Sequence, residues 1–199
     1  MKIYAFTDLH GRFDLLEKVI DKIPPDSKVI YLGDAIDRGP NSAKVVSKLM
    51  EMQAEEGWII LKGNHEDMMY YGLRDDSTSY VWYMNGGSAT IASYNNDNEH
   101  MDYDSAWMNN LPTQVDFGHF TFVHAMASND FNERIWGRYY DRDAIDWPRH
   151  VIHGHTPHRF PEMKNNRTNL DIGAYKSGKV ALAIINTNIP NCVNVITVE

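Results

Sequence analysis

The sequence predicts a mixed α/β (α+β) fold in which two β-sheets pack together with helices outside. In the first third of the chain, apolar runs of strand length alternate with segments of helical periodicity. From Gln114 onward the pattern changes to short strands separated by turns. Alternating strands and helices build a parallel sheet, whereas a series of strands builds a second layer. The 199 residues contain no linker or repeat, so we expect a single domain over residues 1–199.

Two strand–helix–strand units are predicted in the first third of the chain. The three strands are expected at residues 3–7, 28–32 and 58–61. Between the first two, apolar side chains at helical spacing predict a helix over residues 13–23, which Pro24 ends. Between the second and third, Asn41 or Ser42 caps a predicted helix that ends near Gly57. This order favours a parallel sheet with right-handed crossover connections.

The middle of the chain is predicted to be helical and the remainder to be β-rich. Residues 64–110 show helical spacing, interrupted by an expected polar loop at residues 95–100. The later strands are expected at residues 113–117, 119–124, 151–153, 168–172, 179–185 and 192–198. Gly118 and the Ser177-Gly178 pair are expected to form hairpin-type turns.

The composition argues against two classes of partner. A net charge of −8 argues against binding of polymeric nucleic acid, because proteins that bind it usually present a basic face. No apolar run approaches transmembrane length, so no membrane partner is expected. Cys192 is the only cysteine, which excludes an intramolecular disulfide. These features predict a cytoplasmic protein and leave its oligomeric state open.

Residue types that bind metal ions follow five of the apolar runs that read as strands. They are Asp8 and His10, Asp34, Asn64, His124, and His155. Further polar residues lie close to two of these positions. Asp37 and Arg38 follow shortly after Asp34, and His65 directly follows Asn64. In open α/β sheets, ligand sites gather at the carboxyl ends of the strands. We therefore expect these side chains to meet at one edge of the fold.

Each cluster also has a structural interpretation. Asn64 could cap a helix, and Asp37 with Arg38 could form a surface ion pair that contributes little. A lone histidine at a strand end, such as His124, is more often structural than a ligand. For His153, roles as a ligand, as a support for a ligand and as a core residue all stay open. The remaining histidines are interpreted as loop or surface residues, namely His100, His119, His150 and His158.

Together the clusters form a mixed oxygen and nitrogen set that is large enough for two ions. Such a set suits Mn, Fe or Zn rather than Ca, whose ligands are all oxygen. Two ions about 3.5 to 4 Å apart can lower the pKa of bound water towards about 7 and stabilise the attacking and leaving oxygens. The guanidinium of Arg38 matches phosphate oxygens in bidentate geometry. These residues predict phosphoester hydrolysis.

The motifs, in their order and spacing, resemble one known family over nearly the whole chain. They are Asp8-Leu9-His10-Gly11, Gly33-Asp34 with Asp37-Arg38-Gly39, Gly63-Asn64-His65-Glu66, Asn85-Gly86-Gly87, His124-Ala125, Ile135-Trp136-Gly137-Arg138 and Gly154-His155-Thr156-Pro157. The chain is similar to calcineurin-like metallophosphoesterases, and within them to bacterial and phage serine/threonine protein phosphatases of the phosphoprotein phosphatase type. The resemblance implies a β-sandwich of two mixed sheets flanked by helices, in agreement with the fold predicted above.

The resemblance also implies two divalent metal ions, with Mn²⁺ as the first choice and Fe, Zn or Ni as alternatives. The implied ligands are Asp8, His10 and Asp34 for the first ion, and Asp34, Asn64, His124 and His155 for the second, with Asp34 as the bridge. Many relatives outside the phosphatase branch carry a further histidine where this chain has Pro157. The first ion is therefore expected to complete its ligand set with water.

The remaining roles follow from the same resemblance. His65 would be the general acid that protonates the leaving alkoxide, and Asp37 would orient it. Arg38 and Arg138 would bind the phosphate, although Arg138 also has a competing interpretation as a solvated residue in a charged stretch.

The expected activity is serine/threonine phosphomonoester hydrolysis by direct attack of metal-activated water, with a phosphorylated protein or peptide as substrate. The first alternative is a small phosphoester or nucleotide substrate, as in symmetrical dinucleoside tetraphosphate hydrolases. A second alternative is an inactive docking scaffold, which would be expected to lack ligands or the general acid.

Overall fold

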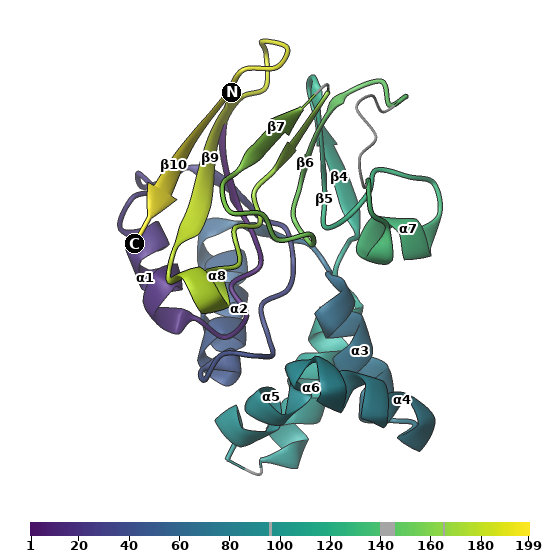
Figure 1. Cartoon of the computed structure of the whole chain (residues 1–199). Coiled ribbons are helices and arrows are strands. Elements are labelled where there is room, and N and C mark those ends of the chain that lie inside the picture. The colour runs from purple at the N-terminus through teal and green to yellow at the C-terminus, as the bar shows by residue number, and fades with distance from the viewer. Residues whose placement is uncertain (96, 140–145, 165) are drawn as a thin grey trace.

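The computed structural model describes residues 1–95, 97–139, 146–164 and 166–199, and in them two five-stranded sheets lie face to face (Figure 1). The first sheet has the order β10-β9-β1-β2-β3, with β1 Lys2–Phe6, β2 Lys28–Tyr31, β3 Ile59–Ile60, β9 Val180–Asn186 and β10 Val193–Val198. The second has the order β4-β5-β6-β8-β7, with β4 Gln114–Phe117, β5 Phe120–Val123, β6 His150–His153, β7 Glu162–Lys164 and β8 Arg167–Asn169. Both sheets mix parallel and antiparallel neighbours, which confirms the predicted sandwich.

The first third of the chain forms the parallel part of the first sheet, as predicted. β1 pairs in parallel with β2, and β2 with β3. Helices α1 (Phe13–Ile20) and α2 (Ser42–Glu56) connect them and lie beside this sheet (Figure 1). Leu16 of α1 and Leu49 of α2 are buried in one apolar cluster with Phe6 of β1. This cluster is the core between the helices and the first sheet.

A second core lies between the two sheets. Ile3 and Ala5 of β1 pack with Phe120 and Phe122 of β5, and all four are fully buried. Phe6 belongs instead to the core on the helical side, because successive strand residues point to opposite faces. Burial of one such large apolar side chain contributes about 1.5–3 kcal/mol, and this packing fixes how the two sheets meet.

The part of the chain that connects β3 to β4 forms a helical segment that projects beyond the sandwich (Figure 1). Its elements are α3 (Asn64–Gly72), α4 (Asp76–Trp82), the turn η1 (Tyr83–Gly87), α5 (Ser88–Ser93) and α6 (Asn98–Asn109). Gly86 interrupts the helical backbone of η1 with a φ of 108°, a conformation that favours glycine. The predicted helical character of this region is confirmed.

Two predicted connections are wrong. The polar loop expected at residues 95–100 is cut short, because α6 begins at Asn98 after the Asp97 side chain accepts a hydrogen bond from the His100 backbone N–H. The Ser177-Gly178 pair is not a hairpin turn. It ends the short helix α8 (Ala174–Ser177), which connects a strand of the second sheet to one of the first. Gly118 does lie in the turn between β4 and β5.

The β-rich half contains elements that the pattern did not predict. Besides α8, these are helix α7 (Phe131–Trp136) and strand β7. The strand expected at residues 168–172 is also shorter than predicted, because β8 ends at Asn169. His150 is not a surface residue as interpreted. It is 6% exposed, and its ring contacts the Asn191 side chain and the Thr168 hydroxyl.

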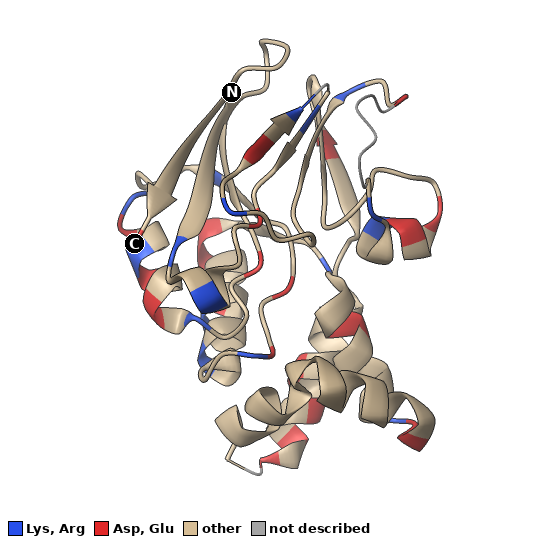
Figure 2. Cartoon of the chain, in the orientation of Figure 1, with Lys and Arg blue, Asp and Glu red and all other residues tan. Residues whose placement is uncertain are grey.

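The charged residues are dispersed over the molecule. Lys and Arg are interspersed with Asp and Glu over the sandwich and its flanking helices, without forming one continuous basic stripe (Figure 2). Among the described residues, no helix has the length and apolar character that crossing a bilayer would require.

Candidate metal centre and active site

The predicted ligand residues lie together at one edge of the sandwich, where loops leave the strands. Asp8 follows β1, Asp34 follows β2, and Asn64 follows β3 as the first residue of α3. From the second sheet, His124 follows β5 and His155 follows β6. Strand ends of both sheets therefore supply the site, as the sequence pattern predicted.

The backbone of these loops is held in an uncommon conformation. Asp8, His10, Asp34 and His155 have φ values of 52°, 45°, 59° and 69°, a region that residues other than glycine seldom occupy. Hydrogen bonds tie the loops to each other, including those from the backbone N–H of Asp8 to Gly33 O at 3.1 Å and from that of His10 to Asp34 O at 3.0 Å. Such backbone strain persists where surrounding structure enforces it, commonly at functional sites.

Two groups of buried donor atoms meet around Asp34. One consists of His10, Asp34 and His65, and the other of Asp34, His124 and His155, with the donor atoms of each group within 4.8 Å of one another. The amide oxygen of Asn64 adjoins the second group, 3.1 Å from His124 Nε2 and 2.9 Å from His155 Nδ1. Asp34 thus belongs to both groups.

Asp8 is placed differently from the other predicted ligands. Among the described residues, neither donor group includes Asp8, and His65 lies with His10 and Asp34 instead. The Asp8 carboxylate accepts hydrogen bonds from the Thr7 hydroxyl at 2.5 Å and from the His155 backbone N–H at 3.1 Å. The Asp8 carboxylate therefore supports the backbone of His155, a member of the second donor group.

The chemistry of this site fits divalent cations. Burial raises the pKa of both Asp8 and Asp34 well above the usual carboxyl range. Like-charge repulsion from Asp171 adds to the shift in pKa at Asp8, and repulsion from Asp8 adds to the shift at Asp34. Burial lowers the pKa of His10 and His124 well below the usual range, so their nitrogens are available as ligands. Buried carboxylates gathered in this way are ordinarily compensated by a metal or a paired charge.

One further observation supports the fit. The Nε2 atom of His155 is buried and has no hydrogen-bond partner among the described residues, while its Nδ1 atom faces Asn64. A mixed set of imidazole nitrogens and carboxylate and amide oxygens suits Mn, Fe or Zn. The site is therefore a dimetal site of the kind that two buried His/Asp groups can form.

Glu66 is a supporting residue that the sequence analysis missed. Its carboxylate accepts three backbone hydrogen bonds, from Gly63 at 2.7 Å, Asp34 at 2.9 Å and Ala35 at 2.8 Å. Glu66 therefore caps α3 and at the same time fixes the loop that carries Asp34. The alternative that Asn64 is the helix cap is wrong, because Gly63 occupies that position and the Asn64 side chain faces the histidines. The sequence signal that could have identified this capping role is a Glu three residues after the helix cap.

His65 and Asp37 form a buried pair. His65 Nδ1 lies 2.6 Å from Asp37 Oδ2, and both side chains are at most 2% exposed. The carboxylate of Asp37 also accepts hydrogen bonds from Trp82 Nε1 at 3.0 Å and from the Thr90 hydroxyl at 2.6 Å. Burial raises the pKa of Asp37 to about 7 and lowers the pKa of His65 well below its usual value. A surface ion pair of Asp37 with Arg38 is therefore excluded.

Both predicted phosphate-binding arginines line one cavity of about 300 Å³ that also contains Asp34, Asn64, His65 and His155. Arg38 Nη2 lies 2.9 Å from His65 Nε2, and its backbone N–H donates to Gly86 O at 3.3 Å. Arg138 is exposed at the rim and donates to the Thr156 hydroxyl at 3.3 Å. The cavity thus combines cationic walls with the buried donor groups.

Two more residues near the centre were not predicted. Asp171 is 4% exposed, and burial raises its pKa to about 6. It was missed because it was placed inside a strand, whereas β8 ends two residues earlier. Tyr175 lines the cavity, and the guanidinium of Arg38 lies 5.1 Å from its ring centre.

The structure also answers the open question about His153. His153 is 3% exposed and belongs to neither donor group. Its Nε2 atom accepts a hydrogen bond from Arg167 at 3.2 Å, and its ring contacts Tyr139. His153 therefore takes part in a neighbouring buried cluster instead of the metal centre.

Comparisons with known proteins agree with this geometry. Serine/threonine-protein phosphatase 1 of Salmonella typhimurium is 28% identical, over 92% of this chain and 91% of that protein. The asymmetrical bis(5'-nucleosyl)-tetraphosphatase PrpE of Anoxybacillus flavithermus is 23% identical, over 87% of this chain and 86% of that protein. This relative is an asymmetrical enzyme, whereas the alternative drawn from the sequence was a symmetrical one.

Solved structures share the fold at low sequence identity. A putative diadenosine tetraphosphatase superposes with a TM-score of 0.70 at 16% identity, covering 100% of this chain and 94% of that one. The cold-active protein-tyrosine phosphatase of a Shewanella species superposes with a TM-score of 0.72 at 14% identity, covering 100% and 80%. The family model described as calcineurin-like phosphoesterase matches residues 1–185. The chain belongs to the calcineurin-like phosphoesterase family.

Proposed function

We propose that this chain is a metal-dependent phosphomonoesterase that acts on phosphorylated serine and threonine in proteins. The observation that carries the proposal is the buried His65–Asp37 pair at a cavity that two arginines line beside the donor groups. A proton donor, two phosphate-binding cations and a metal centre are the parts that alkyl phosphate hydrolysis needs. The likeness to serine/threonine-protein phosphatase 1 over 92% of the chain supports the same substrate class.

The proposed ligands are those that the family resemblance implies. Asp8, His10 and Asp34 would hold one ion, and Asp34, Asn64, His124 and His155 the other. When bound, two divalent cations, with Mn²⁺ as the first choice, supply Lewis-acid stabilisation of phosphoryl oxygens and lower the pKa of water. His65 lies within the first donor group and Asp8 does not. The proposal nevertheless assigns Asp8 to that ion and leaves His65 as the general acid, because the family resemblance implies these roles.

The protein's own side chains would bind and orient the phosphate. Arg38 and Arg138 reach the same cavity from different loops, so their forks can hold separate phosphoryl oxygens. Tyr175 packs against the Arg38 guanidinium and restricts its movement. Clamping of this kind aligns phosphorus with the attacking oxygen and lowers the entropic part of the barrier.

His65 is the proposed general acid. Its Nδ1 atom faces Asp37 at 2.6 Å, which leaves Nε2 directed at Arg38 and the cavity. A serine or threonine alkoxide is a poor leaving group, so donation of a proton from Nε2 as the ester bond breaks lowers the barrier. Asp37 holds the ring in the required orientation and compensates the charge of protonated His65.

A second candidate is asymmetrical dinucleoside tetraphosphate hydrolysis. It is favoured by the similarity to PrpE over 87% of this chain. Its products would be a nucleoside monophosphate and a nucleoside triphosphate, whereas symmetrical hydrolysis would release two nucleoside diphosphates.

The test compares substrates on the Mn²⁺-loaded protein. Phosphoserine, phosphothreonine and phosphotyrosine peptides, an aryl phosphate and a dinucleoside tetraphosphate are each assayed for kcat/KM. We expect the serine and threonine peptides to be hydrolysed most efficiently. Efficient cleavage of the dinucleotide without release of phosphate from any peptide would contradict the proposal, and the products would identify the cleavage mode.

Variants test the assigned roles. Asp34→Asn and His65→Asn should each lower kcat on a phosphoserine peptide by about a hundredfold or more. His119→Asn, at an exposed histidine in the turn between β4 and β5, is the control and should retain activity. Near-normal kcat in folded, metal-loaded Asp34→Asn or His65→Asn protein would refute the assignment of that residue.

A further inference from the structure

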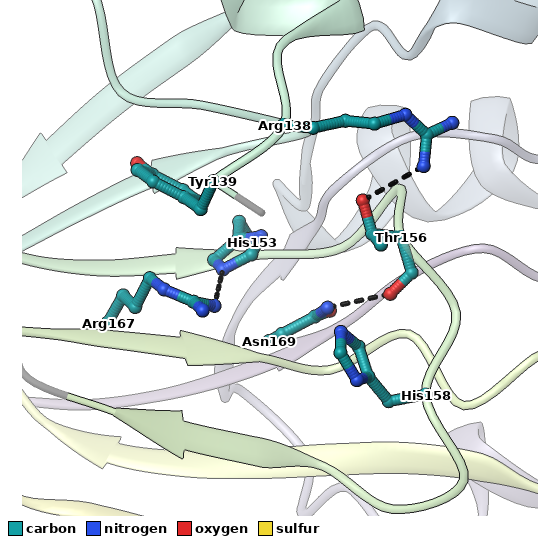
Figure 3. Close-up of a pocket in the computed structure, with 7 residues that line it drawn as sticks. All are labelled: Arg138, Tyr139, His153, Thr156, His158, Arg167 and Asn169. Atoms are coloured by element: carbon teal, nitrogen blue, oxygen red, sulfur yellow. Dashed lines mark hydrogen bonds between the residues drawn. The ribbon is translucent and has the colours of Figure 1, made fainter. Parts of the chain in front are cut away.

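A second cavity, of about 220 Å³, shares Arg138 with the cavity of the candidate active site, and Figure 3 shows the residues that line it. Its walls come from β6, β8 and the loops around them, and Arg167, His153 and His158 are among its lining residues. None of these three side chains has a role in the mechanism proposed above. We call this cavity the flanking pocket.

The flanking pocket adjoins the phosphate cavity. Arg138 lines both cavities, and its guanidinium donates a hydrogen bond to the hydroxyl of Thr156, which also lines the flanking pocket (Figure 3). Thr156 directly follows the donor residue His155. A substrate whose phosphate lies at Arg138 would therefore present its neighbouring groups to the flanking pocket.

Arg167 is a buried cation in the wall of this pocket. It is only 2% exposed, and it contacts Glu162 at 2.6 Å and His153 at 3.2 Å. Its guanidinium lies over the Tyr139 ring at 5.0 Å. The Nε–H group is buried and has no acceptor among the described residues. Because an unpaired buried donor is costly, this arrangement favours a ligand that brings an acceptor.

The charges around the flanking pocket favour an anion. Glu162, which does not line the pocket, contacts both Arg167 and Lys164, at 2.6 and 3.2 Å. In the described part of the chain, no carboxylate forms an ion pair with Arg138. Among the described residues that line the pocket, Arg138 and Arg167 are cationic and none carries a carboxylate, which favours an anionic ligand.

We propose that the flanking pocket binds an acidic group, a carboxylate or a second phosphate, that neighbours the phosphorylated residue of a protein substrate. This inference rests on the proposed phosphatase function and specifies the substrate class. Arg167 recognises the anion, Arg138 lines both this pocket and the phosphate cavity, and Thr156 and His158 line the approach. The pocket would thus make the enzyme selective for phosphorylation sites in acidic sequences.

The test uses a series of phosphoserine peptides that differ at one residue near the phosphoserine. That residue is aspartate, phosphoserine, alanine or lysine, placed in turn on each side. The Mn²⁺-loaded protein should show about tenfold higher kcat/KM for the acidic members than for the alanine peptide, and lower values for lysine. Comparison of aspartate with phosphoserine distinguishes a carboxylate from a phosphate as the bound group.

His158→Glu places a negative charge at the pocket while leaving the arginines and the metal centre intact. The His158 side chain is 37% exposed, so the substitution is compatible with folding. It should abolish the preference for acidic peptides and leave hydrolysis of an aryl phosphate unchanged. His119→Glu makes the same change at an exposed histidine outside the pocket and should keep the preference. Arg167→Met, checked by thermal unfolding, should lose the preference as well.

The results separate this inference from the proposed function. Equal kcat/KM for all peptides, or an acidic preference that survives in His158→Glu, would overturn the flanking-pocket proposal while the phosphatase function stands. Absence of peptide hydrolysis together with cleavage of a dinucleoside tetraphosphate would overturn both. In that case, a higher KM of His158→Glu for the dinucleotide would assign the pocket to nucleotides.

Discussion

The indole Nε1–H of Trp82 lies 3.0 Å from Oδ1 and 3.1 Å from Oδ2 of Asp37, 45 residues earlier in the chain. Trp82 is 2% exposed, and it packs against glycines so closely that a Cβ atom at Gly87 would lie 2.7 Å from its ring. Through this contact, the helical segment α3–α6 positions the Asp37 carboxylate, which in turn contacts His65 Nδ1. Trp82 is a positioning residue for the proposed acid.

Trp82→Phe should lower kcat on a phosphoserine peptide by about tenfold, because Asp37 and His65 lose part of their orientation. Hydrolysis of an aryl phosphate should fall much less, since its leaving group needs less protonation. The matched control is Trp107→Phe, which removes an indole donor to Gln53 away from the site. Equal losses on both substrates would show that Trp82 acts through general stability instead.

Gly86→Ala tests the contact between the helical segment and Arg38. A Cβ atom at Gly86 would lie 2.8 Å from the Arg38 backbone nitrogen, so Arg38 must shift. We expect KM for a phosphopeptide to rise several-fold, because Arg38 is a proposed phosphate ligand. Gly57→Ala also places alanine at positive φ but meets nothing within 4 Å. If Gly57→Ala raised KM equally, displacement of Arg38 would be excluded as the cause.

Glu66→Gln tests the support of the Asp34 loop. Glutamine has one side-chain acceptor oxygen, whereas Glu66 accepts three backbone hydrogen bonds through two oxygens. At least one buried donor would lose its partner, at a cost of about 1–3 kcal/mol in the free energy of unfolding. Denaturant unfolding measures this loss. Glu51→Gln, at an exposed residue of α2, is the control and should change stability by less than about 0.5 kcal/mol. A stability of Glu66→Gln equal to that of the control would contradict the assigned role.

Removal and addition of metal test the dimetal site through stability instead of activity. At Mn²⁺ concentrations about 100 times the Kd, binding to the folded chain should stabilise it by about 2.7 kcal/mol. Thermal unfolding with Mn²⁺ and with a chelator gives the corresponding shift in Tm. His124→Ala should reduce the shift, because it removes a donor of the second group, whereas His119→Ala should not. An undiminished shift in His124→Ala would argue against His124 as a ligand.

Sequence patterns predicted that Asp34 and His124 lie at one edge of the fold, because the signal for this placement is local. Asp34 and His124 directly follow apolar runs, and strands bring such positions to one edge whatever the details of packing. The approach of Trp82 and Thr90 to Asp37 has no local signal, since it depends on how α4 and α5 pack. Asp171 was missed for a related reason, because only the tertiary structure shows that β8 ends before it.

The helical segment α3–α6 contributes to the rim of the cavity but supplies the donor groups only through its first two residues, Asn64 and His65. The rim of the cavity and the donor groups therefore come from partly separate parts of this architecture. An engineer could graft a different helical segment onto the sandwich to change which substrates it accepts. Such a chimera would have to retain counterparts of Trp82 and Thr90. Asp37, which orients the proposed general acid His65, would otherwise lose their hydrogen bonds.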